Sequence, residues 1–193
     1  QQRNYSVFAS VNFSYKDYLF LNATARNDWS SVFSDGNQSY FYPSVGASFI
    51  PTKAFEDFGG DVLNYLKLSG SFVRVGSAGS IDPFDINQVV EQGAGFPFDG
   101  LNSFQAPGSI TDPDIQPEFT EQFEFGINAG FLKDRITLDA AYYDFSTEDL
   151  ITSISTSSAS GLRRSRINIG QTSGYGFEID LGLVPLRSED FNW

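Results

Sequence analysis

The segment from Pro117 to Phe145 contains two runs in which apolar and polar residues alternate. From Phe119 to Phe131 every second residue is apolar except Glu121, and the residues between them are polar or glycine. Successive side chains of a strand point to opposite faces, so these runs predict a hairpin with one apolar and one polar face. Each run has about ten residues or more, which is long for a soluble strand but suits a tilted strand that crosses a bilayer.

The same alternation along the rest of the chain predicts about seven strands. We expect them at residues 4–15, 18–28, 40–50, 62–76, 119–131, 135–147 and 174–184. Lys16 and Asp17 read as a two-residue turn. Pro43 belongs at a strand entrance or a bulge, because proline has no N–H for a ladder hydrogen bond. The link from Pro51 to Asp61 could hold a short helix, and Phe191 to Trp193 reads as the start of another strand.

The parity of each strand assigns its side chains to one of two environments. The predicted lipid-facing residues share the apolar parity: Leu19, Leu21, Phe123, Phe125, Ile127, Phe177, Ile179 and Leu181. The predicted lumen-facing residues share the polar parity: Asn22, Thr24, Arg26, Asp28, Gln122, Glu124 and Asn128. The charges of Arg26 and Asp28 require a hydrated face, because burying them unpaired costs free energy. On that face they could contact a substrate or the plug, or they could form part of a ladder of cross-strand charge pairs.

Connection lengths indicate what kind of sheet these strands form. Short turns alternate with long connections, of which residues 77–118 form the longest; only the Pro51 to Asp61 link blurs the pattern. In an antiparallel sheet this puts short turns on one side and long loops on the other, as in outer-membrane barrels. About seven strands cannot close such a barrel. The fold class is therefore all-β, an antiparallel transmembrane β-barrel segment that is an incomplete arc.

Composition removes several classes of function. The chain has Cys 0 and His 0, so it lacks thiolate chemistry and the commonest general base and metal ligand. Its formal net charge of −12 makes nucleic acid a poor partner. No window approaches the roughly 18 apolar residues of a transmembrane helix. With Met 0 and a start at Gln1, we expect residues 1–193 to be an internal piece of a longer chain or a processed product.

Several separated motifs resemble the barrel of SusC/RagA-type TonB-dependent outer-membrane transporters of Bacteroidetes. They are LFLNATARNDWSSVF, SYFYPSVGASF, IQPEFTEQFEFGIN, Tyr142-Tyr143, and Asn168-Ile169-Gly170 followed by Gly176-Phe177-Glu178. The resemblance implies the C-terminal half of a barrel of about 22 strands with a plugged lumen. It also implies TonB-driven import of oligosaccharides or peptides beneath a SusD-like surface lipoprotein. The plug domain and the TonB-binding segment lie outside this sequence.

The long loop at residues 77–118 carries two kinds of candidate site. Its acidic residues Asp82, Asp85, Asp112 and Asp114 could bind Ca²⁺, although their spacing is not that of an EF-hand and Asp-Pro pairs also start turns. The rings of Phe96, Phe98 and Phe104, with Asp99, could contact a sugar substrate or the lid lipoprotein. The alternative is that these rings pack the loop against its neighbours or against a lid protein.

The alternatives to transport are a soluble binding module and an enzyme. A soluble all-β carbohydrate-binding module would also alternate, but its strands are shorter and its long loops are not confined to one side. An enzyme is not expected, because no nucleophile motif is present and Glu121 and Glu124 differ in parity and so point to opposite faces. Arg163, Arg164 and Arg166 could meet lipopolysaccharide phosphates or an acidic substrate, or simply form the solvated base of a loop.

Overall fold

A computed structural model describes residues 2–79 and 81–186 of the chain. The strand expected to start at Phe191 lies outside the described residues. Within the described residues no helix has the length and apolar character needed to cross a membrane.

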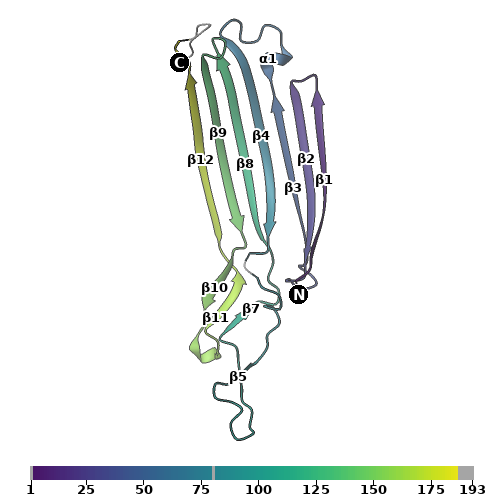
Figure 1. The fold of residues 1–193 in the computed structure, drawn as a ribbon, viewed down its shortest axis with the longest axis vertical. Helices are drawn as coiled ribbons and strands as arrows, with labels where there is room; N and C mark the ends of the chain where they lie inside the picture. Colours follow the sequence, from purple (N-terminus) through teal and green to yellow (C-terminus); the bar gives the residue numbers. More distant parts are fainter. Residues whose placement is uncertain (1, 80, 187–193) are drawn as a thin grey trace.

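One antiparallel sheet dominates the structure (Figure 1). Its seven long strands have 11 to 15 residues each and lie in the order β1-β2-β3-β4-β8-β9-β12. Their bounds are β1 Asn4–Tyr15, β2 Leu19–Ser30, β3 Ser39–Phe49, β4 Leu63–Ser77, β8 Glu118–Phe131, β9 Ile136–Glu148 and β12 Gln171–Leu183. These bounds differ from the expected ranges by at most three residues. The predicted fold class, an antiparallel barrel-type sheet, is confirmed.

The short connections lie together at one end of the sheet, at the top of Figure 1. Lys16 and Asp17 both have positive φ, the backbone pattern of the type I′ turn that suits tight hairpins. Leu132, Lys133 and Asp134, which join β8 to β9, also have positive φ. The Pro51 link holds the expected short helix, α1 (Pro51–Ala54), at this same end. The link that blurred the sequence pattern therefore belongs with the short turns.

The long connections lie at the opposite end and are more ordered than the sequence predicted. The 77–118 loop contains β5 (Glu91–Gln92), β6 (Phe104–Gln105) and β7 (Ser109–Thr111). The Ser/Thr-rich loop after β9 contains β10 (Ile151–Ser155), the 3₁₀ helix η1 (Ser158–Ser160) and β11 (Arg164–Asn168). Strand β11 pairs antiparallel with β10 and parallel with β7, so one three-stranded sheet ties the two loops together. The expectation of irregular loops was wrong, because these short strands pair across distant sequence.

The buried hydrophobic cluster lies among these loops and not on the large sheet. Val32, Phe33, Ile81 and Ile115 are buried together, and Tyr40, Ala78, Ile86 and Ile151 pack against them. We call residues 31–38, 78–86 and 109–116 together with β10 and β11 the loop platform. Residues 87–107, which carry β5 and β6, extend beyond it and are called the distal finger (Figure 1). The large sheet itself is a single layer, so the two-layer sandwich of the alternative interpretation is contradicted.

Candidate functional site

The pairing register sorts the strand residues onto two faces of the sheet. One row of partners across six strands is Leu21, Ala47, Gly70, Phe125, Tyr142 and Phe177. The adjacent row on the other face is Asn22, Gly46, Ser71, Glu124, Tyr143 and Gly176. All residues predicted as lipid-facing share the first face, here the apolar face. All residues predicted as lumen-facing share the second, here the polar face.

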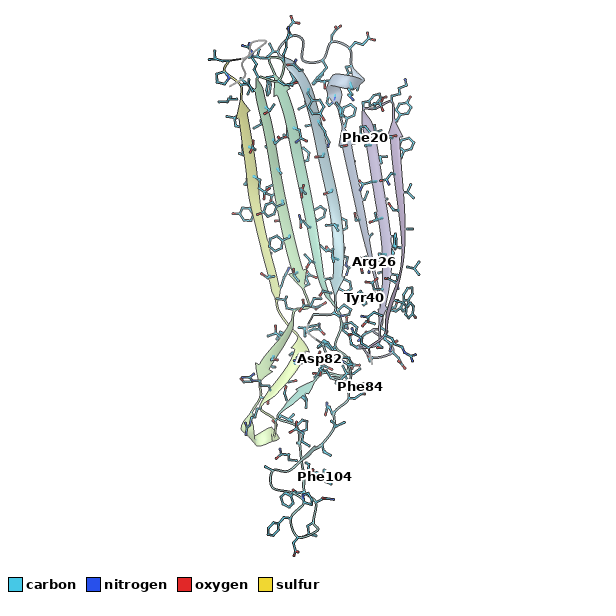
Figure 2. All side chains as sticks on the ribbon, in the orientation of Figure 1. Phe20, Arg26, Tyr40, Asp82, Phe84 and Phe104 are labelled. Carbon is cyan, nitrogen blue, oxygen red and sulfur yellow. The ribbon has the colours of Figure 1, made fainter. Side chains whose placement is uncertain are left out.

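The polar face carries a hydrogen-bonded charge group near the loop end. Arg26 Nε donates to Asp28 Oδ1 at 2.7 Å, and Arg26 Nη2 donates to Ser6 Oγ at 3.3 Å. The Tyr42 hydroxyl donates to the other carboxylate oxygen of Asp28. Arg26 and Asp28 thus pair along β2 itself, and the uncharged Ser6 and Tyr42 link this pair to β1 and β3, so the group is not the cross-strand charge ladder of the plainer interpretation. Figure 2 shows Arg26 near the loop end of the sheet, close to Tyr40.

A second part of the polar face is a shallow acidic groove of about 460 Å³. It is lined by residues of β4, β8, β9 and β12, among them Ser69, Glu124, Asn128, Asp139, Glu178 and Asp180. Asn128 donates a hydrogen bond to Asp139, and Asp139 lies directly opposite Asp180 in the ladder. Like charges that face each other across strands are destabilising unless solvent or a partner compensates them. The groove therefore favours a neutral or cationic occupant.

Aromatic side chains border the apolar face at both ends of the sheet. At the turn end, ring contacts run in a series through Tyr15, Tyr18, Phe49, Phe55 and Phe58. At the loop end, the rings of Tyr5 and Trp29 stack with centroids 4.9 Å apart. Between these borders large apolar side chains such as Phe177 and Ile179 are exposed. An uncovered apolar band between two aromatic borders is the arrangement of transmembrane barrels.

One charge pair on the apolar face was missed by the sequence analysis. Arg74 on β4 pairs with Glu121 on β8, and Arg74 Nε lies 3.5 Å from Glu121 Oε1. The guanidinium also lies over the Phe119 ring, 4.3 Å from its centroid. The sequence does contain a signal for Arg74. It has the same parity as Leu68 and Phe72, so its charge falls on the face where apolar side chains are expected. The apolar band ends toward the loops at this level.

The acidic residues of the long loop serve its internal structure. Asp85 Oδ2 accepts a hydrogen bond from the backbone N–H of Asp82 at 3.0 Å and pairs with Arg166 at 2.7 Å. Asp112 Oδ1 accepts from the N–H of Asp114 at 2.9 Å. The described part of the chain contains no group of three or more acidic residues arranged to hold a metal ion. Calcium binding in this loop stays a prediction that these contacts do not support.

Arg166 therefore has a structural partner in the loop platform. Its ion pair with Asp85 joins β11 to the long loop across the two connections. Its backbone carbonyl also accepts a hydrogen bond from the Asp112 N–H at 2.9 Å. Arg163 and Arg164 both donate backbone hydrogen bonds to Gly108, which places this basic trio at the base of the distal finger.

The distal finger exposes its rings. Phe98 is 71% exposed, Phe104 66% and Phe96 39%, and the Phe96 N–H donates to the Gly93 carbonyl at 3.2 Å. Phe98 and Leu101 close the tip through two backbone hydrogen bonds, with Asp99 at positive φ between them. Figure 2 shows Phe104 far from Asp82 and Phe84, which lie beside the sheet. Within the described residues Phe98 and Phe104 are therefore not packed into a core with other loops, and packing against a lid protein stays a prediction.

We expect Phe33→Ala to loosen the loop platform without unfolding the sheet. Phe33 is 1% exposed, and truncating a buried phenylalanine to alanine typically costs about 3–5 kcal/mol. Limited proteolysis of the full-length parent in outer-membrane vesicles would measure this as faster cleavage within residues 77–118. The matched control is Phe84→Ala, which truncates a 64% exposed ring elsewhere in the loop platform. Equal cleavage rates for the two variants would contradict a stabilising role for this core.

Glu121 and Glu124, the two carboxylates considered as a catalytic pair, do not lie together. Glu121 pairs across the ladder with Arg74 and Glu124 with Ser71, so the two carboxylates lie on opposite faces as the parity predicted. The polar face offers hydrogen bonds and charge to a ligand.

Comparison with known proteins agrees with this geometry. The chain is 29% identical over 197 residues to TonB-dependent receptor P26 of Formosa agariphila, a match of 97% of this chain and 19% of that protein. It is also 29% identical over 195 residues to TonB-dependent receptor SusC of Bacteroides thetaiotaomicron, with coverage of 97% and 19%. The chain thus spans about a fifth of the length of these relatives.

Solved structures share the fold. The RagAB peptide importer in its closed-closed state matches with a TM-score of 0.84 and 23% identity, over 98% of this chain and 20% of that one. The siderophore receptor PirA of Pseudomonas aeruginosa matches with a TM-score of 0.62 and 18% identity, over 96% of this chain and 32% of that one. The family model described as TonB dependent receptor-like, beta-barrel, matches residues 1–193. The chain belongs to this family of TonB-dependent receptor β-barrels.

Proposed function

We propose that this chain forms part of the wall of an outer-membrane barrel, with its apolar face toward lipid and its polar face toward the lumen. The observation that carries the proposal is the exposed apolar band between two aromatic borders. Strands of 11 to 15 residues exceed the roughly 9–11 that a tilted strand needs to cross the hydrocarbon core. The polar and glycine residues of the other face suit a water-filled or plugged lumen.

The full-length parent is, on this proposal, an active importer of oligosaccharides or peptides that is driven by TonB. Membership of the receptor family supports import, and one structural relative is described as a peptide importer. The acidic groove around Glu124, Asp139 and Asp180 favours neutral sugars or cationic peptides over anionic solutes, because the local field repels negative charge. The net charge of −12 acts in the same direction.

A SusD-like surface lipoprotein is the proposed partner at the loop end. The distal finger supports this proposal, since exposed Phe98, Leu101 and Phe104 gather on one projecting hairpin. Exposed aromatic clusters of this kind mark protein or ligand contacts more often than plain surface. The loop platform holds the base of the finger through the Arg163 and Arg164 contacts to Gly108.

The sidedness of the barrel provides the test of this function. Residues 77–118 and 154–166 should be extracellular, and Lys16, Asp17 and residues 132–134 periplasmic. Single cysteines in this cysteine-free segment, placed at Ala94 and at Lys133, would be treated on intact cells with an impermeant maleimide. We expect labelling at Ala94 only, and labelling at both sites once the cells are lysed. Labelling at Lys133 but not at Ala94 on intact cells would reverse the topology and reject the proposal.

A further inference from the structure

The ladder between β3 and β4 opens toward the loop end of the sheet. Pairing between these strands runs from Phe49 and Leu68 to Ser44 and Val73 and stops there. β3 continues to pair with β2 as far as Ser39, and β4 continues to pair with β8 as far as Ser77. Pro43 stands at the point of opening and has no N–H to offer β4. The opening leaves a hollow of about 360 Å³, most of whose lining lies on the polar face, while Ala25, Pro43 and Arg74 line it from the apolar face.

Arg74 lies at this opening on the apolar face with incomplete hydrogen bonding. Its Nε atom is buried and has no hydrogen-bond partner among the described residues. The Glu121 carboxylate at 3.5 Å is too distant to satisfy it fully. The Phe119 ring beneath the guanidinium holds the side chain in place. The side chain as a whole is 39% exposed, so a phosphate would meet the terminal nitrogens and not the buried Nε, and a fixed guanidinium at the border of an apolar band is suited to that contact.

An apolar groove of about 500 Å³ lies on the same face next to this opening. It exists because Ala47 and Gly70, two small residues, face each other across β3 and β4. Leu21, Val45, Phe72 and Phe125 are among the larger side chains around them. A Cβ added at Gly70 would meet nothing closer than 3.9 Å, so the space is open. A groove of this width and character fits a hydrocarbon chain.

We propose that the β3–β4 seam binds one phosphorylated, acylated glycolipid of the outer leaflet, with a phosphate at Arg74 and an acyl chain over Ala47 and Gly70. This inference rests on the proposed function for the lipid-facing side and for the extracellular position of the loops. Arg74 is four residues from Gly70, which at about 3.3 Å per residue is about 13 Å along the strand. The half-thickness of the hydrocarbon core is about 15 Å, so a lipid anchored at Arg74 reaches the groove with its chain.

The Glu121 carboxylate sets a limit on this site. Because the Glu121 carboxylate lies beside the Arg74 guanidinium, the net charge of the pair is close to zero. A phosphate would therefore be attracted only by those guanidinium nitrogens that do not face Glu121. Glu121→Gln should therefore keep or increase lipid retention, whereas Arg74→Gln should reduce it. A free phosphate ion would bind Arg74 without filling the groove. A lipid without phosphate would fill the groove without binding Arg74. The two features together select a molecule with both parts.

The test is lipid retention by the full-length parent purified from outer membranes in mild detergent. Native mass spectrometry would count phosphorylated glycolipid per protein as detergent is increased, for the wild type and for Arg74→Gln, Glu121→Gln and Gly70→Leu. We expect Arg74→Gln and Gly70→Leu to lower retention on the order of tenfold, the effect of one charge-assisted hydrogen bond or one filled groove. The control is Ala23→Leu, which introduces the same side chain on the apolar face outside the groove and adds one carbon less than Gly70→Leu.

Each other outcome rejects the inference. Equal retention by Arg74→Gln and the wild type would remove the phosphate contact, and loss in Ala23→Leu would make the effect one of general bulk. If a glycerophospholipid were recovered in place of the glycolipid, the lipid would not come from the outer leaflet as proposed. If the wild type were a dimer and Gly70→Leu a monomer, the groove would instead bind a second copy of the protein. Heat-dependent gel migration of every variant separates these results from failure of the barrel itself. A wild type without that shift would reject the proposed function instead.

Discussion

Phe125→Arg should prevent most assembly of the full-length barrel, whereas Asn128→Arg should leave assembly close to that of the wild type. Phe125 lies on the apolar face between Gly70 and Tyr142, and its ring is half exposed where lipid is proposed. Arginine at the bilayer midplane costs about 2–4 kcal/mol on a lipid-facing position. Asn128 lies on the polar face beside the Asp139 carboxylate, which would pair with an introduced guanidinium.

Folding yield into lipid vesicles measures this difference. The folded and unfolded forms of each variant would be separated by heat-dependent migration on gels, with vesicle composition held constant. The two substitutions introduce the same side chain three residues apart on one strand, so each controls for the other. Equal yields would show that the two faces do not differ in environment, and the assignment of lipid and lumen sides would fail.

Removal of Gly93 to Phe104 should leave the barrel folded but lower uptake by the full-length parent on the order of tenfold, the effect of losing a cluster of aromatic contacts. The design is favourable because the Gly93 N–H donates to the Ser103 carbonyl at 2.9 Å, so a short Gly/Ser linker can join the cut ends. Loop length itself has only a weak effect on stability. The expected loss of uptake therefore comes from the rings of Phe96, Phe98 and Phe104. None of them belongs to the buried core of the loop platform or packs against it.

Growth on the cognate nutrient, compared with surface abundance of each variant, measures the effect. A second variant with serine at Phe96, Phe98 and Phe104 keeps the full loop length and isolates the contribution of the rings. Asp99→Asn tests whether the charge at the tip contributes separately. Normal growth at normal abundance in both the deletion and the serine variant would show that the finger contacts neither substrate nor lid.

The large sheet could be predicted from the sequence because its information is local. Alternation from Phe119 to Phe131 determines both the strand and its faces. The expected two-residue turn at Lys16 and Asp17 would pair Tyr15 with Tyr18, whereas the structure pairs Tyr15 with Leu19 across a three-residue connection. The loops carry no such period. Strand β11 pairs in parallel with β7 over a wide separation in sequence, and nothing in the composition of either segment indicates that partner.

The candidate site divides in the same way. The polar-face residues followed from parity, whereas Arg74 required knowing that its neighbour across the ladder is Glu121 and that pairing with β3 stops at Ser44. The sequence marked Phe96, Phe98 and Phe104 as candidate contact residues, but it did not predict that they are exposed. The same spacing of phenylalanines is equally compatible with a small buried core. Burial depends on what lies beside a segment, and a single sequence does not state that.

The loop platform has a consequence for the order in which the protein matures. Its core joins Phe33, from the connection after β2, to Ile81 and Ile115 from the connection before β8, and Ile151 from the connection after β9 packs against it. These segments meet only when the strands between them already stand in their final order, since β3 and β4 must hold the two ends in place. The platform is therefore a late structure that exists only on a correctly assembled wall. A partner that binds across this platform would therefore require the strands of the sheet to stand in this order.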